Sequence, residues 1–412
     1  MTDATLTSWI DVPAGHDFPL ANLPFGIFST PNRSARPGMR LGDHVVDLSA
    51  CHALGFLNSV EVNAEVLAAP VLNPLMKLGK SVTVSLRERV QALLREDCPD
   101  LRDRNDAHAS CLVPIDDVQM HMPVEVGDYT DFYSSEDHAR NVGKMFRDPD
   151  NALLPNWKHM PVGYHGRASS IVVSGTPIRR PMGQTRPDPE APPVFGPSRL
   201  LDFELEMAFI TFEGKPMGER ITTAEAEDHI FGLVLFNDWS ARDIQKWEYV
   251  PLGPFLGKNF GSSISPWVVT LEALDHLRVA GPSQDPAVLD YLTYEGDSHY
   301  DVPLEVEIVP EGQDAGQVVC RSNFRHMYWN MRQQLAHHTV NGCNLRAGDM
   351  MASGTISGPE KGSFGSMLEI SWRGTEPVAM PDGSERKFIQ NGDTVVMRAP
   401  YFGEVRGKLL PA

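Results

Sequence analysis

Residues 201–210 read Leu-Asp-Phe-Glu-Leu-Glu-Met-Ala-Phe-Ile, and the predicted fold depends on how this stretch is interpreted. Apolar and acidic residues alternate strictly over 203–207, which is the period of a β-strand. The three apolar side chains of this run are expected to face a core, with Glu204 and Glu206 on the opposite face. Such alternation usually marks a half-exposed strand with a solvated polar face. Taken alone, the stretch therefore favours a surface strand over a functional site.

Two further segments each add a carboxylate to this picture. Residues 234–240, Val-Leu-Phe-Asn-Asp-Trp-Ser, read as a buried strand that ends at Asp238, and residues 127–135 place Asp131 just ahead of a predicted helix. With the two glutamates these residues would form an all-oxygen site, which suits Ca²⁺ or Mg²⁺ better than zinc or copper. Without a cation, converging carboxylates would raise one another's pKa. Spacing alone does not prove that the segments meet.

Helical spacing groups several other polar residues. His138, Val142 and Met145 share one face of the predicted helix that starts near residue 136. A lone histidine over an apolar face is more often structural than catalytic, so this pattern alone favours the structural interpretation. Arg242 and Gln245 are three residues apart in a second predicted helix and share its face.

The first 118 residues are predicted to form a separate, structural domain. Residues 40–48 read as a hairpin with a Gly-Asp turn, and Ser85 with Glu88 predicts a capping box at a helix start. Residues 119–412 are predicted to form a second, mostly β domain, with strands at 304–309 and 394–398. The proline-rich residues 177–197 are interpreted as a long surface loop.

Composition excludes several classes of protein. The 412 residues include 36 Lys and Arg against 54 Asp and Glu, for a net charge of −18. That balance argues against nonspecific binding to nucleic acid or to an anionic membrane. Five cysteines without a C-x-x-C pair argue against a disulfide framework or a thiolate zinc site. The N-terminus lacks the pattern of a secretory signal and no apolar run approaches about 20 residues, so a cytoplasmic protein is predicted.

Several long runs of this sequence resemble the fumarylacetoacetate hydrolase family. They include Asp128-Tyr-Thr-Asp-Phe-Tyr-Ser-Ser, Pro161-Val-Gly-Tyr-His-Gly-Arg, Asn237-Asp-Trp-Ser-Ala-Arg-Asp-Ile-Gln, Tyr249-Val-Pro-Leu-Gly-Pro-Phe-Leu-Gly-Lys and Ser353-Gly-Thr-Ile-Ser-Gly-Pro-Glu, together with residues 201–207 and 365–369. The likeness is dense over about 121–375 and weaker towards the N-terminus. It implies a mostly β fold with some α, in which a small SH3-like β-barrel precedes a larger β-rich catalytic domain. It also implies a homodimer.

The resemblance further implies an activity and a set of site residues. The reaction would be hydrolysis of 4-fumarylacetoacetate to fumarate and acetoacetate, the last step of tyrosine and phenylalanine breakdown, with bound Mg²⁺ or Ca²⁺. Carried over position by position, the catalytic residues would be His138 as base, Glu369 as its orienting partner, and Arg242, Gln245 and Lys258 around the oxyanion. The substrate would be held by Tyr133, Arg147, Tyr164, Gln245, Tyr249 and Thr355. The metal neighbourhood would comprise Asp131, Glu204, Glu206, Asp238, Lys258 and Ser262.

Two of these positions need separate comment. An ammonium group cannot ligate a cation, so Lys258 would act through its backbone carbonyl, a water or a substrate oxygen. At Ser262 the family pattern has threonine, and serine keeps the hydroxyl. The competing interpretations are a related enzyme, such as an acylpyruvate hydrolase, decarboxylase or hydratase of small oxo acids, and a noncatalytic, metal-dependent dicarboxylate-binding protein. Presence of both His138 and Glu369 favours the hydrolase.

Overall fold

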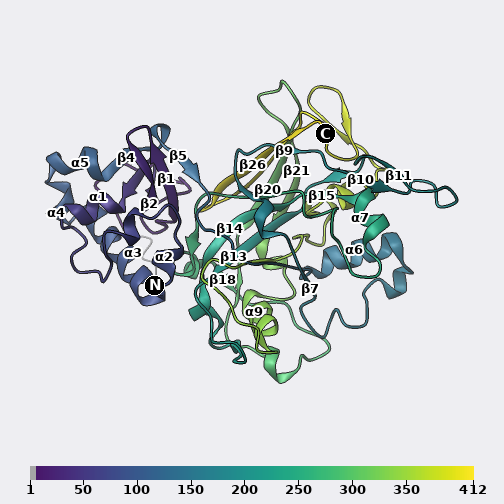
Figure 1. Cartoon of the computed structure of the whole chain (residues 1–412), viewed down its shortest axis with the longest axis horizontal. Coiled ribbons are helices and arrows are strands. Elements are labelled where there is room, and N and C mark those ends of the chain that lie inside the picture. Colours follow the sequence, from purple (N-terminus) through teal and green to yellow (C-terminus); the bar gives the residue numbers. More distant parts are fainter. Residues whose placement is uncertain (1–5) are drawn as a thin grey trace.

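A computed structural model describes residues 6–412 and shows a smaller N-terminal body beside a larger one (Figure 1). The smaller body is built on a five-stranded antiparallel sheet in the order β4-β3-β2-β1-β5. Its strands are β1 (Phe25–Thr30), β2 (Arg33–Leu41), β3 (His44–Asp47), β4 (Leu112–Pro114) and β5 (Gln119–His121). Its helices are α1 (Leu48–Ala53), α2 (Asn73–Met76), α3 (Lys80–Leu94), α4 (Pro99–Arg102) and α5 (Asn105–Cys111).

The predicted hairpin at residues 40–48 is confirmed. Strands β2 and β3 pair in antiparallel register, with Leu41 opposite His44 across the turn at Gly42. The sheet to which they belong is an open path, because β4 and β5 lie at its two edges and are not paired with each other in the described chain. Closure into an SH3-like barrel therefore stays a prediction.

The helix predicted from the Ser85 capping box exists, but its predicted start is wrong. Helix α3 begins at Lys80, after Gly79 with φ of 88°, so Ser85 lies inside the helix rather than at its cap. The apolar spacing is confirmed, since Leu86, Val90 and Leu93 are buried. Burial of this face decides the helix, because packing of an apolar stripe outweighs a local capping signal.

The larger body contains two main sheets. The first has the order β7-β6-β22-β13-β14-β16-β8, with β17 also paired to β14. Its strands are β6 (Tyr129–Phe132), β7 (Gly163–His165), β8 (Ile171–Val173), β13 (Leu205–Thr211), β14 (Ile230–Asp238), β16 (Ser262–Ile264), β17 (Val269–Thr270) and β22 (Met350–Ala352). The second, in the order β21-β20-β25-β26-β9, comprises β9 (Ile178–Arg179), β20 (Pro303–Val309), β21 (Gln317–Asn323), β25 (Thr394–Ala399) and β26 (Gly403–Leu410).

Helices and short ribbons complete this body. The helices are α6 (Glu136–Phe146), α7 (Arg242–Glu248), α8 (Leu271–Leu274), α9 (Met331–Thr339) and α10 (Met367–Ile370). The two-stranded ribbons pair β10 (Met182–Thr185) with β11 (Val194–Pro197), β12 (Leu201–Asp202) with β15 (Ser240–Ala241), β18 (Arg278–Val279) with β19 (His299–Tyr300), and β23 (Val378–Ala379) with β24 (Glu385–Arg386). The β10–β11 hairpin lies in the proline-rich segment and projects from the body (Figure 1).

The stretch at 201–210 is buried on both faces, so its interpretation as a surface strand is wrong. It forms β12 and β13 with a break between them, and Glu206 is 0 % exposed. On one face of β13, Ile210 joins the apolar core shared with the N-terminal body, and on the other Met207 joins the core beneath the second sheet. The alternation over 203–207 resembles that of an amphipathic strand because its acidic side chains line a buried polar site instead of facing solvent.

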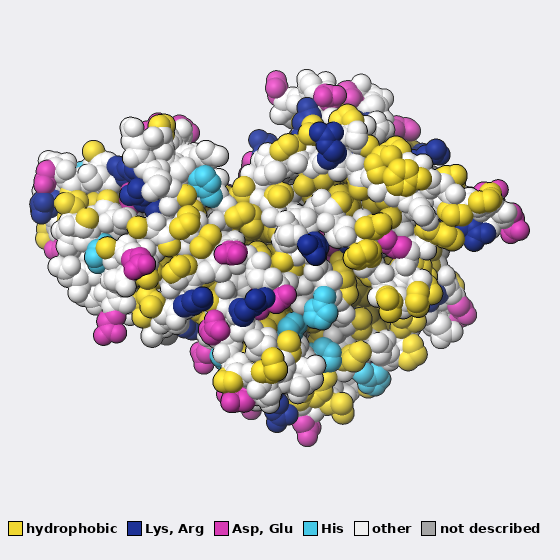
Figure 2. Space-filling model, in the orientation of Figure 1, with side chains coloured by type: hydrophobic (Ala, Val, Ile, Leu, Met, Phe, Trp, Pro, Cys, Tyr) yellow, Lys and Arg dark blue, Asp and Glu magenta, His cyan; other side chains and the backbone are white. Residues whose placement is uncertain are grey.

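The surface is acidic without a single dominant patch on the face shown in Figure 2, where basic and acidic side chains are interspersed. All five cysteines are free thiols. Across residues 6–412, the helices are too short or too polar to traverse a bilayer.

Candidate active site

Sheet pairing brings the predicted carboxylates together. Strand β22 lies between β6 and β13, with Ala352 opposite both Asp131 and Ala208, and β13 pairs in turn with β14. Asp131 thus stands on β6, Glu206 on β13, and Asp238 at the end of β14. Residues more than 100 positions apart in the sequence therefore meet at one end of one sheet.

The four predicted metal ligands form a compact, buried cluster. One ligand oxygen from each of Asp131, Glu204, Glu206 and Asp238 lies within 4.8 Å of the other three. Burial, followed by the charge of Asp238, raises the pKa of Asp131 well above its ordinary value. Burial and the charge of Asp131 do the same for Glu206. The shifts combine the cost of burying a carboxylate, which is the larger cause, with the repulsion expected among converging carboxylates.

Lys258 and Ser262 lie against this cluster. The Lys258 ammonium is 2.6 Å from Glu204 Oε2 and 2.6 Å from Asp238 Oδ2, and the Ser262 hydroxyl donates to Asp238 Oδ1 at 3.1 Å. Burial lowers the pKa of Lys258, but Asp238 and Glu204 outweigh this and raise it above its ordinary value. Lys258 thus contacts two of the four carboxylates and supplies one positive charge against their four negative charges.

The remaining charge fits a divalent cation. Asp131 Oδ1 and Glu206 Oε1 are buried and accept no hydrogen bond from any described residue. An unpaired buried carboxylate oxygen is costly, and a hard cation with oxygen ligands removes that cost. The other Glu206 oxygen accepts from the Gly354 amide at 3.0 Å. Gly354 has φ of 77° and its missing side chain leaves room for the Phe132 carbonyl, so the backbone can approach closely only with glycine.

A histidine–glutamate pair lies beside the cluster. His138 on α6 and Glu369 on α10 are both buried, and Nδ1 of the imidazole is 2.7 Å from Glu369 Oε2. Donation from Nδ1 leaves Nε2 as the free basic nitrogen. The predicted face of α6 is confirmed, because Met145 and His138 are both buried on it. A protonated His138 lowers the pKa of Glu204, so the pair and the cluster share one electrostatic environment.

Glu369 is held by donors on all sides. Asn141 donates to Oε1 at 2.9 Å, Ser366 donates to Oε2 at 2.8 Å, and Ser357 is 3.0 Å from both oxygens. Burial would raise the pKa of Glu369, but the charge of His138 and these hydrogen bonds outweigh it and lower the pKa. The carboxylate is therefore ionised and fixed in orientation.

Arg242 reaches the cluster from α7. Its Nη1 lies 2.7 Å from Glu204 Oε1 and donates to Gln245 Oε1 at 3.3 Å, which confirms the predicted shared face. Arg242 Nη2 is buried and donates to no described residue. Burial raises the pKa of Glu204, but the charges of Lys258 and Arg242 outweigh it and lower the pKa below its ordinary value.

The predicted substrate residues divide into two groups. Tyr164 donates to Asp238 Oδ2 at 3.3 Å, the Tyr133 ring packs edge-on against His138 with centroids 5.2 Å apart, and the Thr355 hydroxyl is buried. Two other predicted residues are exposed. Arg147 donates to the Ala152 carbonyl, and Tyr249 is 54 % exposed after α7. The structure therefore places Tyr133 beside His138 and Tyr164 against the carboxylate cluster, buries Thr355 directly after Gly354, and leaves Arg147 and Tyr249 at the surface.

Sequence reasoning missed four residues that support the site: Asp202, Asn141, Ser357 and Ser366. Signals for three of them were present. Asp202 continues the alternation of Glu204 and Glu206 by one step, Asn141 is three residues after His138 on a helix, and Ser366 with Glu369 has the capping-box spacing. Ser357 carries no such local signal.

A buried cluster of carboxylates beside a histidine–glutamate pair and a free guanidinium nitrogen defines the site of a metal-dependent hydrolase. Comparison with known proteins agrees. The family profile described as "Fumarylacetoacetate (FAA) hydrolase C-terminal" matches residues 128–410, and "Fumarylacetoacetase N-terminal" matches residues 21–123. The chain belongs to the fumarylacetoacetate hydrolase family.

Curated relatives and a solved structure resemble the chain over nearly its whole length. It is 51 % identical to fumarylacetoacetase of Homo sapiens, over 98 % of this chain and 99 % of the relative. It is 52 % identical to fumarylacetoacetase of Caenorhabditis elegans, over 99 % and 100 %. A fumarylacetoacetate hydrolase from Exiguobacterium antarcticum has the same fold, with a TM-score of 0.55 and 19 % identity over 95 % of this chain and 100 % of that one.

Proposed function

We propose that this enzyme hydrolyses the carbon–carbon bond of 4-fumarylacetoacetate to give fumarate and acetoacetate, the last step of tyrosine and phenylalanine breakdown. The observation that carries the proposal is the buried hydrogen bond of 2.7 Å between His138 and Glu369 beside four converging carboxylates. Full-length likeness to fumarylacetoacetases supports the choice of substrate. A noncatalytic dicarboxylate-binding protein would need the carboxylates but not the buried pair.

In this mechanism His138 Nε2 accepts a proton from water as the water oxygen bonds to one carbonyl carbon of the β-diketone. Glu369 holds the opposite ring nitrogen and stabilises the imidazolium that forms. The bond between that carbon and the neighbouring methylene carbon then breaks. Its electron pair passes to the acetoacetate fragment, which takes up a proton to complete the products.

The developing negative charge meets a positive environment. Arg242 Nη2 is a buried donor without a partner in the described chain, and it is assigned to the tetrahedral oxyanion together with Gln245 and Lys258. Tyr133, Tyr164 and Thr355 are assigned to the bound substrate. Arg147 and Tyr249 are assigned to its outer end, which requires them to move or to lie at the rim of the pocket.

Asp131, Glu204, Glu206 and Asp238 would hold Mg²⁺ or Ca²⁺, with Lys258 and Ser262 in the neighbourhood. When bound, the cation would supply Lewis acidity and positive charge at the carboxylate cluster. The unpartnered oxygens of Asp131 and Glu206 support this assignment. All-oxygen ligation favours these two ions over zinc.

Other parts of the proposal follow from the family resemblance and stay predictions. They are a domain boundary between residues 118 and 119, an SH3-like barrel in residues 1–118, a catalytic domain in residues 119–412, a cytoplasmic location and a homodimer. Light scattering on the purified protein measures the oligomeric state, and a monomeric mass would contradict the homodimer.

The test is direct. Purified protein is mixed with fumarylacetoacetate, and loss of the ultraviolet absorbance of the conjugated diketone is followed with and without a chelator. An acylpyruvate is assayed in parallel as the competing substrate. The proposal fails if fumarylacetoacetate is not consumed at enzyme-like rates, or if the acylpyruvate is strongly preferred. Unchanged turnover after verified metal removal would contradict only the role of the metal.

A further inference from the structure

We propose that Asp202 is a positioning residue that fixes Arg242 and helix α10 relative to each other, and so aligns the oxyanion donor with the histidine–glutamate pair. The catalytic readout of this inference rests on the function proposed above. Asp202 lies on β12, is 0 % exposed, and is absent from the residues assigned to metal, substrate or proton transfer.

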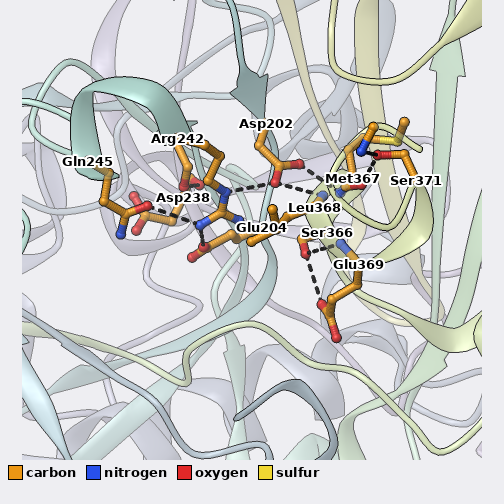
Figure 3. A network of polar contacts seen from close by, with 12 residues as sticks. Asp202, Glu204, Asp238, Arg242, Gln245, Ser366, Met367, Leu368, Glu369 and Ser371 are labelled. Atoms are coloured by element: carbon orange, nitrogen blue, oxygen red, sulfur yellow. Dashed lines mark hydrogen bonds and ion pairs between the residues drawn. The ribbon is translucent and has the colours of Figure 1, made fainter. Parts of the chain in front are cut away.

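Asp202 uses both carboxylate oxygens to contact two separate parts of the site (Figure 3). Its Oδ2 accepts from Arg242 Nε at 2.8 Å and from the Leu368 amide at 3.0 Å, and its Oδ1 accepts from the Met367 amide at 2.7 Å. All three partners are donors. A carboxylate, which only accepts, suits this environment better than any other side chain of its size.

The contact to Arg242 determines which guanidinium nitrogen remains free. Asp202 accepts from Nε and Glu204 lies 2.7 Å from Nη1, so the planar guanidinium is held on two sides. Nη2 is left buried and without a described partner. Because the guanidinium is rigid and planar, fixing two of its nitrogens fixes the direction of the third. Asp202 therefore orients the donor assigned to the oxyanion.

The contact to α10 fixes the other half of the site. Met367 and Leu368 directly precede Glu369, and Ser366 both caps the helix and donates to Glu369 Oε2. Ser366 also forms a backbone bridge with Glu204. Loss of the Asp202 acceptor would leave two buried amides without a partner and loosen the helical turn that carries Glu369. One carboxylate thus connects the arginine and the glutamate (Figure 3).

The variant Asp202→Asn tests this role with little change of shape. Its amide nitrogen is a donor and must face at least one of the three donors around residue 202. A matched control is Asp393→Asn. Asp393 is also 0 % exposed and binds a buried arginine, with Oδ2 at 2.7 Å and Oδ1 at 2.8 Å from Arg386, and it likewise accepts a backbone amide at 2.8 Å.

Both variants lose a buried aspartate–arginine contact, and both are expected to melt at a lower temperature than the wild type. Only D202N is expected to lower kcat, by about 10- to 100-fold, the range typical for residues that orient a catalytic group. KM is expected to change by less than about threefold, because Asp202 does not touch substrate. Equal kcat values for D202N and D393N, with both folded, would overturn the proposal.

A double-mutant cycle separates positioning from general destabilisation. In Arg242→Lys the charge remains but the Nε donor is lost, so the additional effect of D202N on kcat is expected to shrink by more than about threefold. If Asp202 had a purely structural role, D202N would lower kcat by the same factor in the wild type and in the Arg242→Lys variant. That result would contradict the proposal. If D202N does not fold, Asp202→Ser, which retains an acceptor, takes its place in the cycle.

A spectroscopic measurement does not depend on turnover. The short His138–Glu369 hydrogen bond is expected to give a downfield proton resonance that Glu369→Gln abolishes. D202N is expected to shift or broaden that resonance, and D393N is expected to leave it unchanged. An unaltered resonance in D202N would overturn the link to α10 even if the wild type proved inactive on fumarylacetoacetate, whereas an inactive wild type contradicts only the proposed function.

Discussion

Replacing Glu369 by glutamine removes one charge from the centre of the proposed catalytic pair and leaves the side-chain shape nearly unchanged. The carboxylate faces only donors: His138 Nδ1 at 2.7 Å, Asn141, Ser357 and Ser366. A glutamine must direct its NH₂ group at some of these donors. Its oxygen cannot stabilise an imidazolium as a full negative charge does.

The magnitude follows from the electrostatics of a buried pair. Two opposite charges about 4 Å apart at an effective dielectric constant of about 20 attract by about 4 kcal/mol. Because each ~1.4 kcal/mol changes a rate about tenfold, E369Q is expected to lower kcat by about a thousandfold. KM is expected to change little, since Glu369 is 0 % exposed and hydrogen-bonded to His138, Asn141, Ser357 and Ser366.

The assay is loss of fumarylacetoacetate absorbance by the metal-loaded protein, with thermal melting as the check on folding. The control is Glu227→Gln, which removes a carboxylate bound to Arg278 and Arg332 away from the site. This control is expected to destabilise the protein and to leave kcat within about threefold of the wild type. A folded E369Q enzyme with kcat within tenfold of the wild type would refute the reasoning.

Three further predictions concern pH, metal and backbone. Because the folded-state pKa of Glu369 is lowered, its ionisation stabilises the protein above the unfolded pKa of about 4.3, and this contribution is lost as pH falls through the folded pKa. The melting-temperature gap between the wild type and E369Q should therefore be widest near neutral pH and narrow in acid, and a constant gap would contradict this sign. Glu206→Gln removes one charge from the carboxylate cluster, so calorimetry should show at least about tenfold weaker Mg²⁺ or Ca²⁺ binding, and unchanged affinity would exclude Glu206 as a ligand. Gly354→Ala would force a side chain against the Phe132 carbonyl at φ of 77°, so urea unfolding should show a loss of more than about 1 kcal/mol, whereas Gly362→Ala, in open space, should cost less.

Some features of the fold could be predicted because their signals are local. The turn at Gly42 with its flanking strands, the strand ending at Asp238, and the face shared by Arg242 and Gln245 are confirmed. In each case a few neighbouring residues determine the conformation through turn chemistry or periodicity. Local patterns also placed His138 above an apolar helix face.

Other features depend on which parts of the chain pack against the two faces of a strand or helix. A short sequence pattern does not contain that information. The alternation at 201–210 predicts a half-exposed strand, because the sequence of one strand does not show that the N-terminal body covers one face of β13 and the second sheet covers the other. The capping-box prediction at Ser85 is wrong because α3 begins at Lys80, and its buried face includes Thr83 as well as Leu86. Convergence of Asp131 with Glu206 depends on β22 lying between their strands, and the resemblance to a family supplied that information indirectly.

The insertion of β22 between β6 and β13 also bears on how the chain folds during synthesis. All four cluster carboxylates have been made by residue 238, yet the strand that lies between Asp131 and the other three ends only at residue 352. Glu369 emerges later still, 231 positions after the histidine it contacts. The nascent chain thus presents mutually repelling acids long before it can assemble them, and such high contact order slows folding. A chain that ended before β22 would carry every acidic ligand and lack the scaffold that gathers them.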